Sequence, residues 1–298
     1  MDKHARAIIA AARNEIQEAN SADPLGNLWT DAELLEWANE AQNQTVAEIL
    51  DLDENFFGAF FEINTVANVA IYDLPSRFLR MKQVEYVGGG ARLDVPESRA
   101  RPGNPPVLSA SLETLEGAGL AYALFNDQIH FDPPLASALT PGFRCWYIGD
   151  PQELTYGVAS AGAASTITLQ AAVSATGRAA SGDHDYYNGV FLVLTGGTGV
   201  GQRRRVADYD GDTKVATVAT PWSVTPTGTT EYATETVLPS PAWRIPQLFA
   251  AISAKGKYRQ DARQLVSRLN ALHDSLSSLE RRTSTERGVE PFDPDDGL

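Results

Sequence analysis

The motif that most suggests chemistry in this 298-residue sequence is a glycine-rich run at residues 196–203, GGTGVGQR. A Walker-type phosphate loop ends in Gly-Lys-Ser/Thr, because its lysine contacts the phosphates and its hydroxyl binds magnesium. Gln202 and Arg203 follow the last glycine here, and the pattern after them is that of a strand. Without a helix N-terminus, an anion site would lack the helix dipole. We therefore predict a turn between two strands.

Two further segments carry side chains that can bind metals. Residues 208–212, DYDGD, are similar to a calcium loop, but an EF-hand needs Gly at its sixth position and Glu at its twelfth. Here Gly211 is fourth and Ala219 is twelfth. Residues 183–185, DHD, could ligate a metal, yet the histidines are scattered along the sequence, at His4, His130, His184 and His273. We predict a hairpin tip at 208–212 and no metal or cofactor site, with weak surface calcium binding as the alternative.

Three carboxylates, Glu33, Glu36 and Glu40, fall on one face of a predicted helix. Paired carboxylates can hydrolyse glycosides, but one of them must be kept protonated by an apolar pocket. On an exposed helix all three would stay ionised, so we predict no catalytic residues. The single cysteine, Cys145, lies in residues 143–148, FRCWYI, where apolar side chains occupy both faces of the predicted strand. This pattern predicts a buried structural thiol.

Composition limits the class of protein further. Hydrophobic residues make up 43% and charged residues 21% of the chain, as in globular proteins with a packed core. The chain has 24 Lys and Arg against 38 Asp and Glu, which gives a formal net charge of -14. This charge argues against a protein whose main function is to bind nucleic-acid phosphates. One cysteine excludes an internal disulfide framework and a multi-cysteine zinc site. We found neither a signal-peptide pattern nor an apolar run of the ~18 residues that a membrane helix needs, and we expect synthesis in a reducing cytoplasm.

The acidic residues are concentrated near the N-terminus. From Asn14 to Ser76 the sequence contains no Lys or Arg, and it carries thirteen acidic residues. Such a run is most often a solvated helical face. The alternative is a surface that repels a polyanion or docks on a basic partner.

The N-terminal region predicts two helices. Apolar residues recur at helical spacing over residues 3–20, and a break follows at 21–26. Thr30 with Glu33 three residues later predicts a capping box at the start of a second helix, which continues to about Leu50. Trp29 and Leu34 are placed to form the hydrophobic staple of that helix.

The middle of the chain predicts strands. We expect them at residues 61–71, 78–87, 121–131 and 143–148, with a long loop over 91–110. Residues 158–236 are rich in Thr, Ala, Gly and Ser and predict an all-β module with short strands at 166–169, 190–195, 202–209 and 213–219. Asp210-Gly211 predicts a tight primed turn between the last two of these strands. We expect the aromatic residues of 186–232 to form the core of this module.

The C-terminal region carries the cleanest helical pattern. It predicts one helix over residues 245–282, about 55 Å long. Alternating steps of four and three define a heptad seam. The seam consists of Tyr258, Ala262, Leu265, Leu269, Leu272, Leu276 and Leu279. Because so long a helix cannot pack fully on a domain of this size, we expect the seam to meet the N-terminal helices or neighbouring subunits.

These elements predict an α+β protein with two domains. The first, residues 1–157 with 237–282, would hold the two N-terminal helices, a small antiparallel β element and the long C-terminal helix. The second, residues 158–236, would be an all-β domain inserted into it. We expect the acidic tail at 283–298 to order only on assembly.

Several segments resemble tailed-bacteriophage head-to-tail adaptor (connector) proteins. Residues 29–41, WTDAELLEWANEA, resemble the opening helix of that family, and 72–80, YDLPSRFLR, resemble its strand start. Residues 129–135, IHFDPPL, and 146–151, WYIGDP, are similar to its closing strand pair. Residues 186–232 resemble a small β domain that recurs in phage structural proteins, and many adaptors lack such an insertion.

The resemblance implies a structural virion protein without enzymatic activity. Members form a ring, commonly of twelve copies, at the head–tail junction, between the portal protein and the tail or nozzle proteins. DNA would pass through without specific binding, and no membrane is involved. The heptad seam would then be a portal or subunit interface, and Glu33, Glu36 and Glu40 would be channel-facing acids. The alternative is a tail or baseplate protein whose β insertion binds host glycan or calcium.

Overall fold

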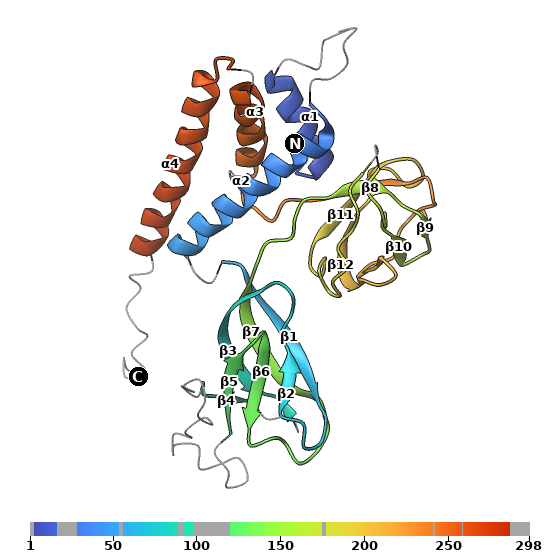
Figure 1. The fold of residues 1–298 in the computed structure, drawn as a ribbon, viewed down its shortest axis with the longest axis vertical. Coiled ribbons are helices and arrows are strands. Elements are labelled where there is room, and N and C mark those ends of the chain that lie inside the picture. The colour runs from blue at the N-terminus through green and yellow to red at the C-terminus, as the bar shows by residue number, and fades with distance from the viewer. Residues whose placement is uncertain are drawn as a thin grey trace, which may run out of the picture. The chain divides into compact units, whose positions relative to one another are not determined.

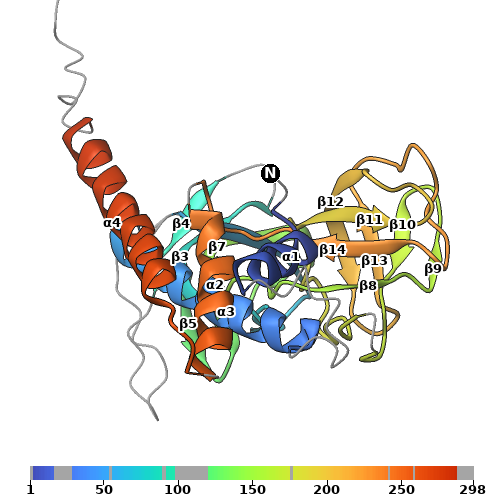
Figure 2. The same ribbon diagram turned by 90° about the horizontal axis from the view of Figure 1, so that it is seen from above.

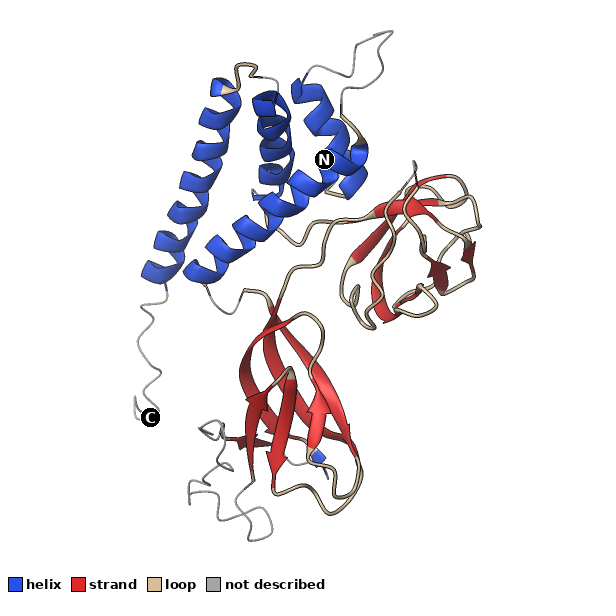
Figure 3. Cartoon of the chain, viewed as in Figure 1, coloured by secondary structure: helices blue, strands red, loops and turns tan. Residues whose placement is uncertain are grey.

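The computed structural model describes residues 3–16, 29–53, 56–88, 92–97, 120–174, 177–240, 242–257 and 259–286, the last ten of these by their backbone alone. The chain forms two compact units, one of residues 1–53 with 151–298 and one of residues 54–150. Figure 1 follows the chain through both units, and Figure 3 separates its helices from its strands. The fold mixes α-helices with antiparallel sheets. The division into these two units falls at residues 53 and 150. The boundaries of the predicted inserted domain, residues 158 and 236, remain a prediction.

The N-terminal helices begin where the sequence indicates. Helix α1 spans Ala5–Ile16 and α2 spans Asp31–Leu52, while residues 17–20 of the expected first helix lie outside the described residues. The capping box is confirmed: the Glu33 amide donates to Thr30 Oγ1 and the Thr30 amide donates to Glu33 Oε2, each at 3.1 Å. Trp29 and Leu34 are buried in one cluster, as the staple requires.

The prediction of one long C-terminal helix is wrong. A 3-10 turn, Ala242–Arg244, leads into α3 (Ile245–Lys257), and α4 (Arg263–Glu286) follows after a break. Gly256 weakens the end of α3, and Arg259 has a φ of 54°. The Asp261 carboxylate then accepts the backbone N–H of Arg263 at 2.9 Å, which starts the next helix.

The helices pack through small apolar side chains. α1 and α3 lie side by side, and α3 also packs against α2 (Figure 2). Their shared cluster contains alanines on all three helices, which let the helix axes approach closely. It consists of Ala5, Ile8, Ile9, Trp29, Leu34, Leu35, Ala38 and Ala254, together with Leu154, Tyr156 and Ala233. Among the described residues, no helix combines the length and apolar character needed to cross a bilayer.

The same unit contains a seven-stranded antiparallel sheet in the order β8-β14-β11-β12-β13-β10-β9. Its strands are β8 (Tyr156–Val158), β9 (Ala161–Gly162), β10 (Thr166–Thr168), β11 (Phe191–Gly196), β12 (Arg203–Asp210), β13 (Val215–Val218) and β14 (Glu231–Thr234). The four strands predicted here are confirmed. Tyr187, Tyr209, Trp222 and Tyr232 are buried in one cluster, as expected of core aromatics.

Two turns connect neighbouring strands of this sheet, one between β11 and β12 and one between β12 and β13. The glycine-rich run connects β11 to β12 as a turn, with positive φ at Gly197, Gly199 and Gly201, which confirms the prediction. The hairpin between β12 and β13 also exists, but its turn covers residues 211–214, and the positive φ of 59° belongs to Lys214. The predicted two-residue primed turn is therefore wrong.

The second unit, residues 54–150, packs a four-stranded sheet, β1-β7-β3-β4, with a three-stranded sheet, β2-β6-β5. Its strands are β1 (Gly58–Thr65), β2 (Ile71–Asp73), β3 (Phe78–Tyr86), β4 (Leu93–Val95), β5 (Ala121–Phe125), β6 (Gln128–Asp132) and β7 (Leu139–Gly149). Phe131 of β6 stacks on Phe143 of β7 with ring centroids 3.8 Å apart, which joins the two sheets in one core.

Two strand predictions in this unit are wrong. The expected strand 61–71 is interrupted by a turn at Ala67 and Asn68, and Asn68 has a φ of 60°. The expected strand 121–131 is the β5–β6 hairpin, whose two turn residues, Asn126 and Asp127, have φ values of 49° and 58°. Positive φ at both central residues is the geometry of a tight hairpin turn. Of the expected loop 91–110, residues 92–97 contain β4 and the remainder lies outside the described residues.

Cys145 is buried, as predicted, and burial raises the pKa of its thiol to about 12. A thiol reagent needs both access and the thiolate. We therefore expect Ellman's reagent to react with native protein only as fast as the second unit opens, and at once in denaturant. Because Cys145 is the only cysteine, the signal has one source. The matched control is Ser137→Cys in a Cys145→Ala background, which places the single thiol at an exposed position. The prediction would be contradicted if the native wild-type protein reacted as fast as this control.

The capping box gives a second prediction. Thr30→Ala removes the acceptor for the Glu33 amide and should lower the free energy of unfolding of the helices by about 1 kcal/mol. Thr30→Ser keeps the hydroxyl and should retain most of that stability. Denaturant melting followed by the helical circular-dichroism signal measures both variants. Equal loss in the two would assign the effect to the Thr30 methyl group instead.

Candidate functional site

The heptad seam was the leading candidate for an assembly surface. Leu265, the first seam residue of α4, is buried against Leu248 and Ala251 of α3. Leu269 and Leu272 are partly buried in the same cluster, together with Ile16 of α1. Leu265, Leu269 and Leu272 are therefore covered mainly by α3, which the prediction had placed in the same helix as the seam, with Ile16 as the contribution of the N-terminal helices.

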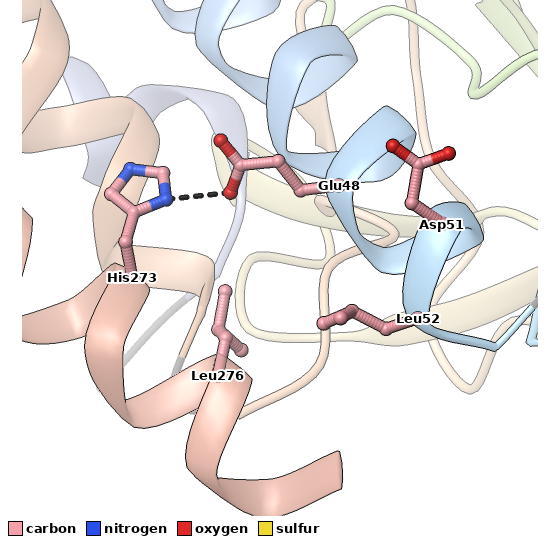
Figure 4. Close-up of a pocket in the computed structure, with 5 residues that line it drawn as sticks. All are labelled: Glu48, Asp51, Leu52, His273 and Leu276. Atoms are coloured by element: carbon pink, nitrogen blue, oxygen red, sulfur yellow. Dashed lines mark hydrogen bonds and ion pairs between the residues drawn. The ribbon is translucent and has the colours of Figure 1, made fainter.

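The second half of the seam contacts α2. Leu276 is buried and lines a pocket with Leu52 of α2, whose other lining side chains are Glu48, Asp51 and His273. Figure 4 shows these side chains between α2 and α4, with His273 Nδ1 2.6 Å from Glu48 Oε2. The contact between His273 and Glu48 thus joins the middle of α4 to the end of α2, and Leu276 and Leu52 line the pocket beside it.

Helix α4 is longer than the helix that covers it. α3 has 13 residues and α4 has 24, which correspond to about 20 Å and 36 Å. α4 accordingly extends past α3 in both views of the fold (Figures 1 and 2). Of the other seam residues, Ala262 lies in the turn before α4, Tyr258 lies outside the described residues, and Leu279 is described by its backbone alone.

The three candidate acids do not form one uniform group. Glu33 accepts the capping bonds and lies 3.2 Å from Lys257 Nζ of α3. The Thr30 backbone N–H, followed by Lys257, lowers the pKa of Glu33 below its ordinary value. Glu36 lies 3.6 Å from Arg178, while Glu40 is exposed and accepts a bond from Gln44 one turn later. Glu33 thus has a structural role, and Glu36 and Glu40 remain the more exposed pair.

Cations from outside the acidic stretch of residues 14–76 pair with several of its acids. At least five of its thirteen acidic residues form ion pairs of this kind. They are Glu15 with Arg268, Asp31 with Arg13, Glu33 with Lys257, Glu36 with Arg178 and Glu62 with Arg144. The acidic stretch is therefore partly neutralised within the fold, which the local sequence did not indicate.

The tyrosines whose pKa values are raised most lie in the core of the seven-stranded sheet. Burial raises the pKa of Tyr232 to about 12 and that of Tyr187 and Tyr209 still higher. Tyr209 Oη donates to the Ser181 carbonyl at 2.7 Å, and the Ser181 amide donates to Tyr187 Oη at 3.1 Å. These phenols hold a loop in place, so their perturbation has a structural cause.

The structure also joins two motifs that the sequence analysis treated separately. His184, from the segment DHD, lies beside Asp210 and Asp212, from the segment DYDGD. The three side chains come from a loop and a hairpin that are 26 residues apart in the chain. Neither segment alone supplies enough ligands for a metal site.

Comparison with known proteins completes the description. The model of the family described as SU10 adaptor protein matches residues 5–172, more than half of the chain. The match begins at α1 and continues through α2, the second unit and the first three strands of the seven-stranded sheet. A comparison with curated proteins gave no match. The chain belongs to the SU10 adaptor protein family, a family of phage structural proteins.

Proposed function

We propose that this protein is a head-to-tail adaptor whose copies form a ring between the portal of the capsid and the tail. The observation that carries this proposal is the adaptor family match over residues 5–172. It favours an adaptor over a tail or baseplate protein that binds glycan or calcium. In this proposal the ring has twelve copies, contacts the portal and the tail or nozzle proteins, and lines the channel through which DNA leaves.

The contacts of the helical bundle are compatible with a mechanical role. α2 is anchored along its length: Asp31 pairs with Arg13, Glu33 with Lys257, and Glu48 with His273. These contacts join α2 to each of the other three helices. A part that transmits force between two assemblies needs such rigidity, and large interfaces rather than bond chemistry would hold the ring together.

The end of α4 is the part of the bundle that we assign to assembly. Beyond Leu276, α4 extends past the end of α3, and the seam continues in the sequence with Leu279. A leucine seam that continues past its intramolecular partner is suited to helices of a neighbouring copy or of the portal. Residues 283–286 of the expected acidic tail already belong to α4, so the expectation that they order only on assembly is wrong. We propose that residues 287–298, which lie outside the described residues, order on assembly.

This assignment predicts a defect in docking. Leu279→Glu places a charge in the seam, and burial of an unpaired charge costs several kcal/mol, so docking on purified portal should weaken by at least about tenfold. Ser278→Glu adds the same charge one position away from the seam and should dock like the wild-type protein. Native mass measurement of the mixtures gives the bound copies and tests for twelve. Docking of Leu279→Glu at wild-type strength would contradict the role of α4.

The exposed acids Glu36 and Glu40 are assigned to the channel wall. An acidic wall would let DNA slide, whereas lysines would hold its phosphates. Phage carrying Glu36→Lys with Glu40→Lys should assemble normally but release DNA several-fold more slowly at low salt, with recovery at high salt. Asp94→Lys, at an exposed strand position of the second unit, is the charge-change control. Release rates in vitro measure the effect, and equal rates in both phages at every salt concentration would exclude this wall.

A further inference from the structure

A compact group of metal-ligating atoms lies at the tip of the β12–β13 hairpin. His184 Nδ1 is 3.6 Å from Asp210 Oδ1, and His184 Nε2 is 3.5 Å from Asp212 Oδ2. One candidate ligand atom from each of the three residues lies within 4.8 Å of the other two. A metal ion with bonds of about 2.0–2.2 Å holds two ligand atoms at most about 4.4 Å apart, so the side chains would move slightly inward to bind one.

The loop that carries His184 is fixed against the hairpin by several hydrogen bonds. One of them, from the Gly211 amide to His184 Nδ1 at 3.3 Å, uses the lone pair of the imidazole and would be given up when the ring binds a metal ion. The others do not involve the three ligands. Tyr209 Oη donates to the Ser181 carbonyl at 2.7 Å, and the Asp185 amide donates to the Tyr209 carbonyl at 2.9 Å. Lys214 Nζ donates to the carbonyls of both Ser181 and Gly211. The loop and the hairpin are thus held together on both sides of His184.

The hairpin tip itself is also fixed. A Cβ at Gly211 would collide with the carbonyl oxygen of Gly182, so only glycine lets the tip approach the loop this closely. The amides of Asp212 and Thr213 donate to Asp210 Oδ1 at 2.9 and 3.2 Å, which sets the orientation of that carboxylate. Ligands that are oriented before binding lose less entropy when the ion binds.

The donor set selects the class of metal. Calcium and magnesium prefer oxygen ligands alone, whereas an imidazole nitrogen with carboxylates suits first-row transition metals and zinc. The two carboxylates offset the charge of a divalent ion. We propose that His184, Asp210 and Asp212 form a binding site for a divalent transition-metal ion such as Zn²⁺, with water completing the coordination.

Such an ion would tie the 181–185 loop to the β12–β13 hairpin. Because the site would not exist in the unfolded chain, binding would stabilise the folded β sheet by mass action. The site stands independently of the adaptor role, since all three residues lie beyond the segment that matches the family.

The test uses full-length protein without a histidine tag, stripped of metal with a chelator. Titration with Co²⁺ alone should give visible absorption bands at one ion per chain, and Zn²⁺ should displace them and raise the melting temperature. His184→Asn and Asp212→Asn should each weaken binding at least about tenfold. Asp183→Asn and Asp208→Asn remove neighbouring carboxylates that are not ligands, and His273→Gln removes a distant histidine, so all three should bind like the wild-type protein.

Folding is not expected to obscure the result. The side chains of His184 and Asp212 are 63% and 85% exposed, so the variants should melt like the wild-type protein in the absence of metal. Wild-type protein that fails to bind Co²⁺ would overturn the proposal, as would undiminished binding by His184→Asn. Preference for Ca²⁺ over Zn²⁺, indifferent to His184, would overturn it in favour of an all-oxygen site.

Discussion

The fold of the first unit depends on one buried hydrogen-bonded contact, between the side chain of Asn39 on α2 and the backbone of Leu154. Asn39 Nδ2 donates to the Leu154 carbonyl at 3.2 Å, and the Leu154 amide donates to Asn39 Oδ1 at 2.7 Å. Both residues are buried, so each unmade bond would leave a desolvated polar group at a cost of about 1–3 kcal/mol. The Asn39 amide thus pairs with both the backbone N–H and the carbonyl of Leu154. This double hydrogen bond fixes the point at which the chain returns to the helices.

The neighbouring contacts extend this anchor. Gln42 Nε2 donates to the Gln152 carbonyl at 2.8 Å, and its Oε1 accepts from Thr236 Oγ1 at 2.6 Å. One face of α2 thereby holds both the segment that enters the seven-stranded sheet and the segment that leaves it. Leu154, Tyr156 and Ala233 then join the apolar cluster of the helices. This explains why helices and sheet form one compact unit, although their compositions differ sharply.

The sequence predicted those features that depend on near neighbours. The Thr30–Glu33 capping box, the strands of 166–219 and the burial of Cys145 follow from patterns a few residues long. Some errors were avoidable on the same basis: Asn126-Asp127 is a pair that tolerates positive φ, and Gly256 with Asp261 marks a helix end and a new start. The periodicity of the C-terminal leucines outweighed those signals because the leucines from Leu265 to Leu279 do lie on one helix, α4, although that helix begins only after the break.

Other features could not be predicted because they depend on contacts across the fold. Asn39 and Leu154 are 115 residues apart, and nothing in either segment indicates the other. The same holds for the candidate metal ligands, since DHD and DYDGD each supply too few ligands alone and become a group only when the hairpin packs on the loop. A site assembled from two weak segments is visible only once the packing of the 181–185 loop on the β12–β13 hairpin is known.

The charge of the molecule illustrates the difference between local and summed electrostatics. Ion pairs with Arg268, Arg13, Lys257, Arg178 and Arg144 hold acids of the 14–76 stretch in place. They leave the net charge of -14 unchanged, because both partners belong to this chain. At physiological salt, exposed charges are largely screened beyond a Debye length of about 8 Å, so a polyanion would sense mainly the charges within that distance of it. The acidic stretch therefore contributes ion pairs to both units, and the excess of acidic over basic residues remains as net negative charge.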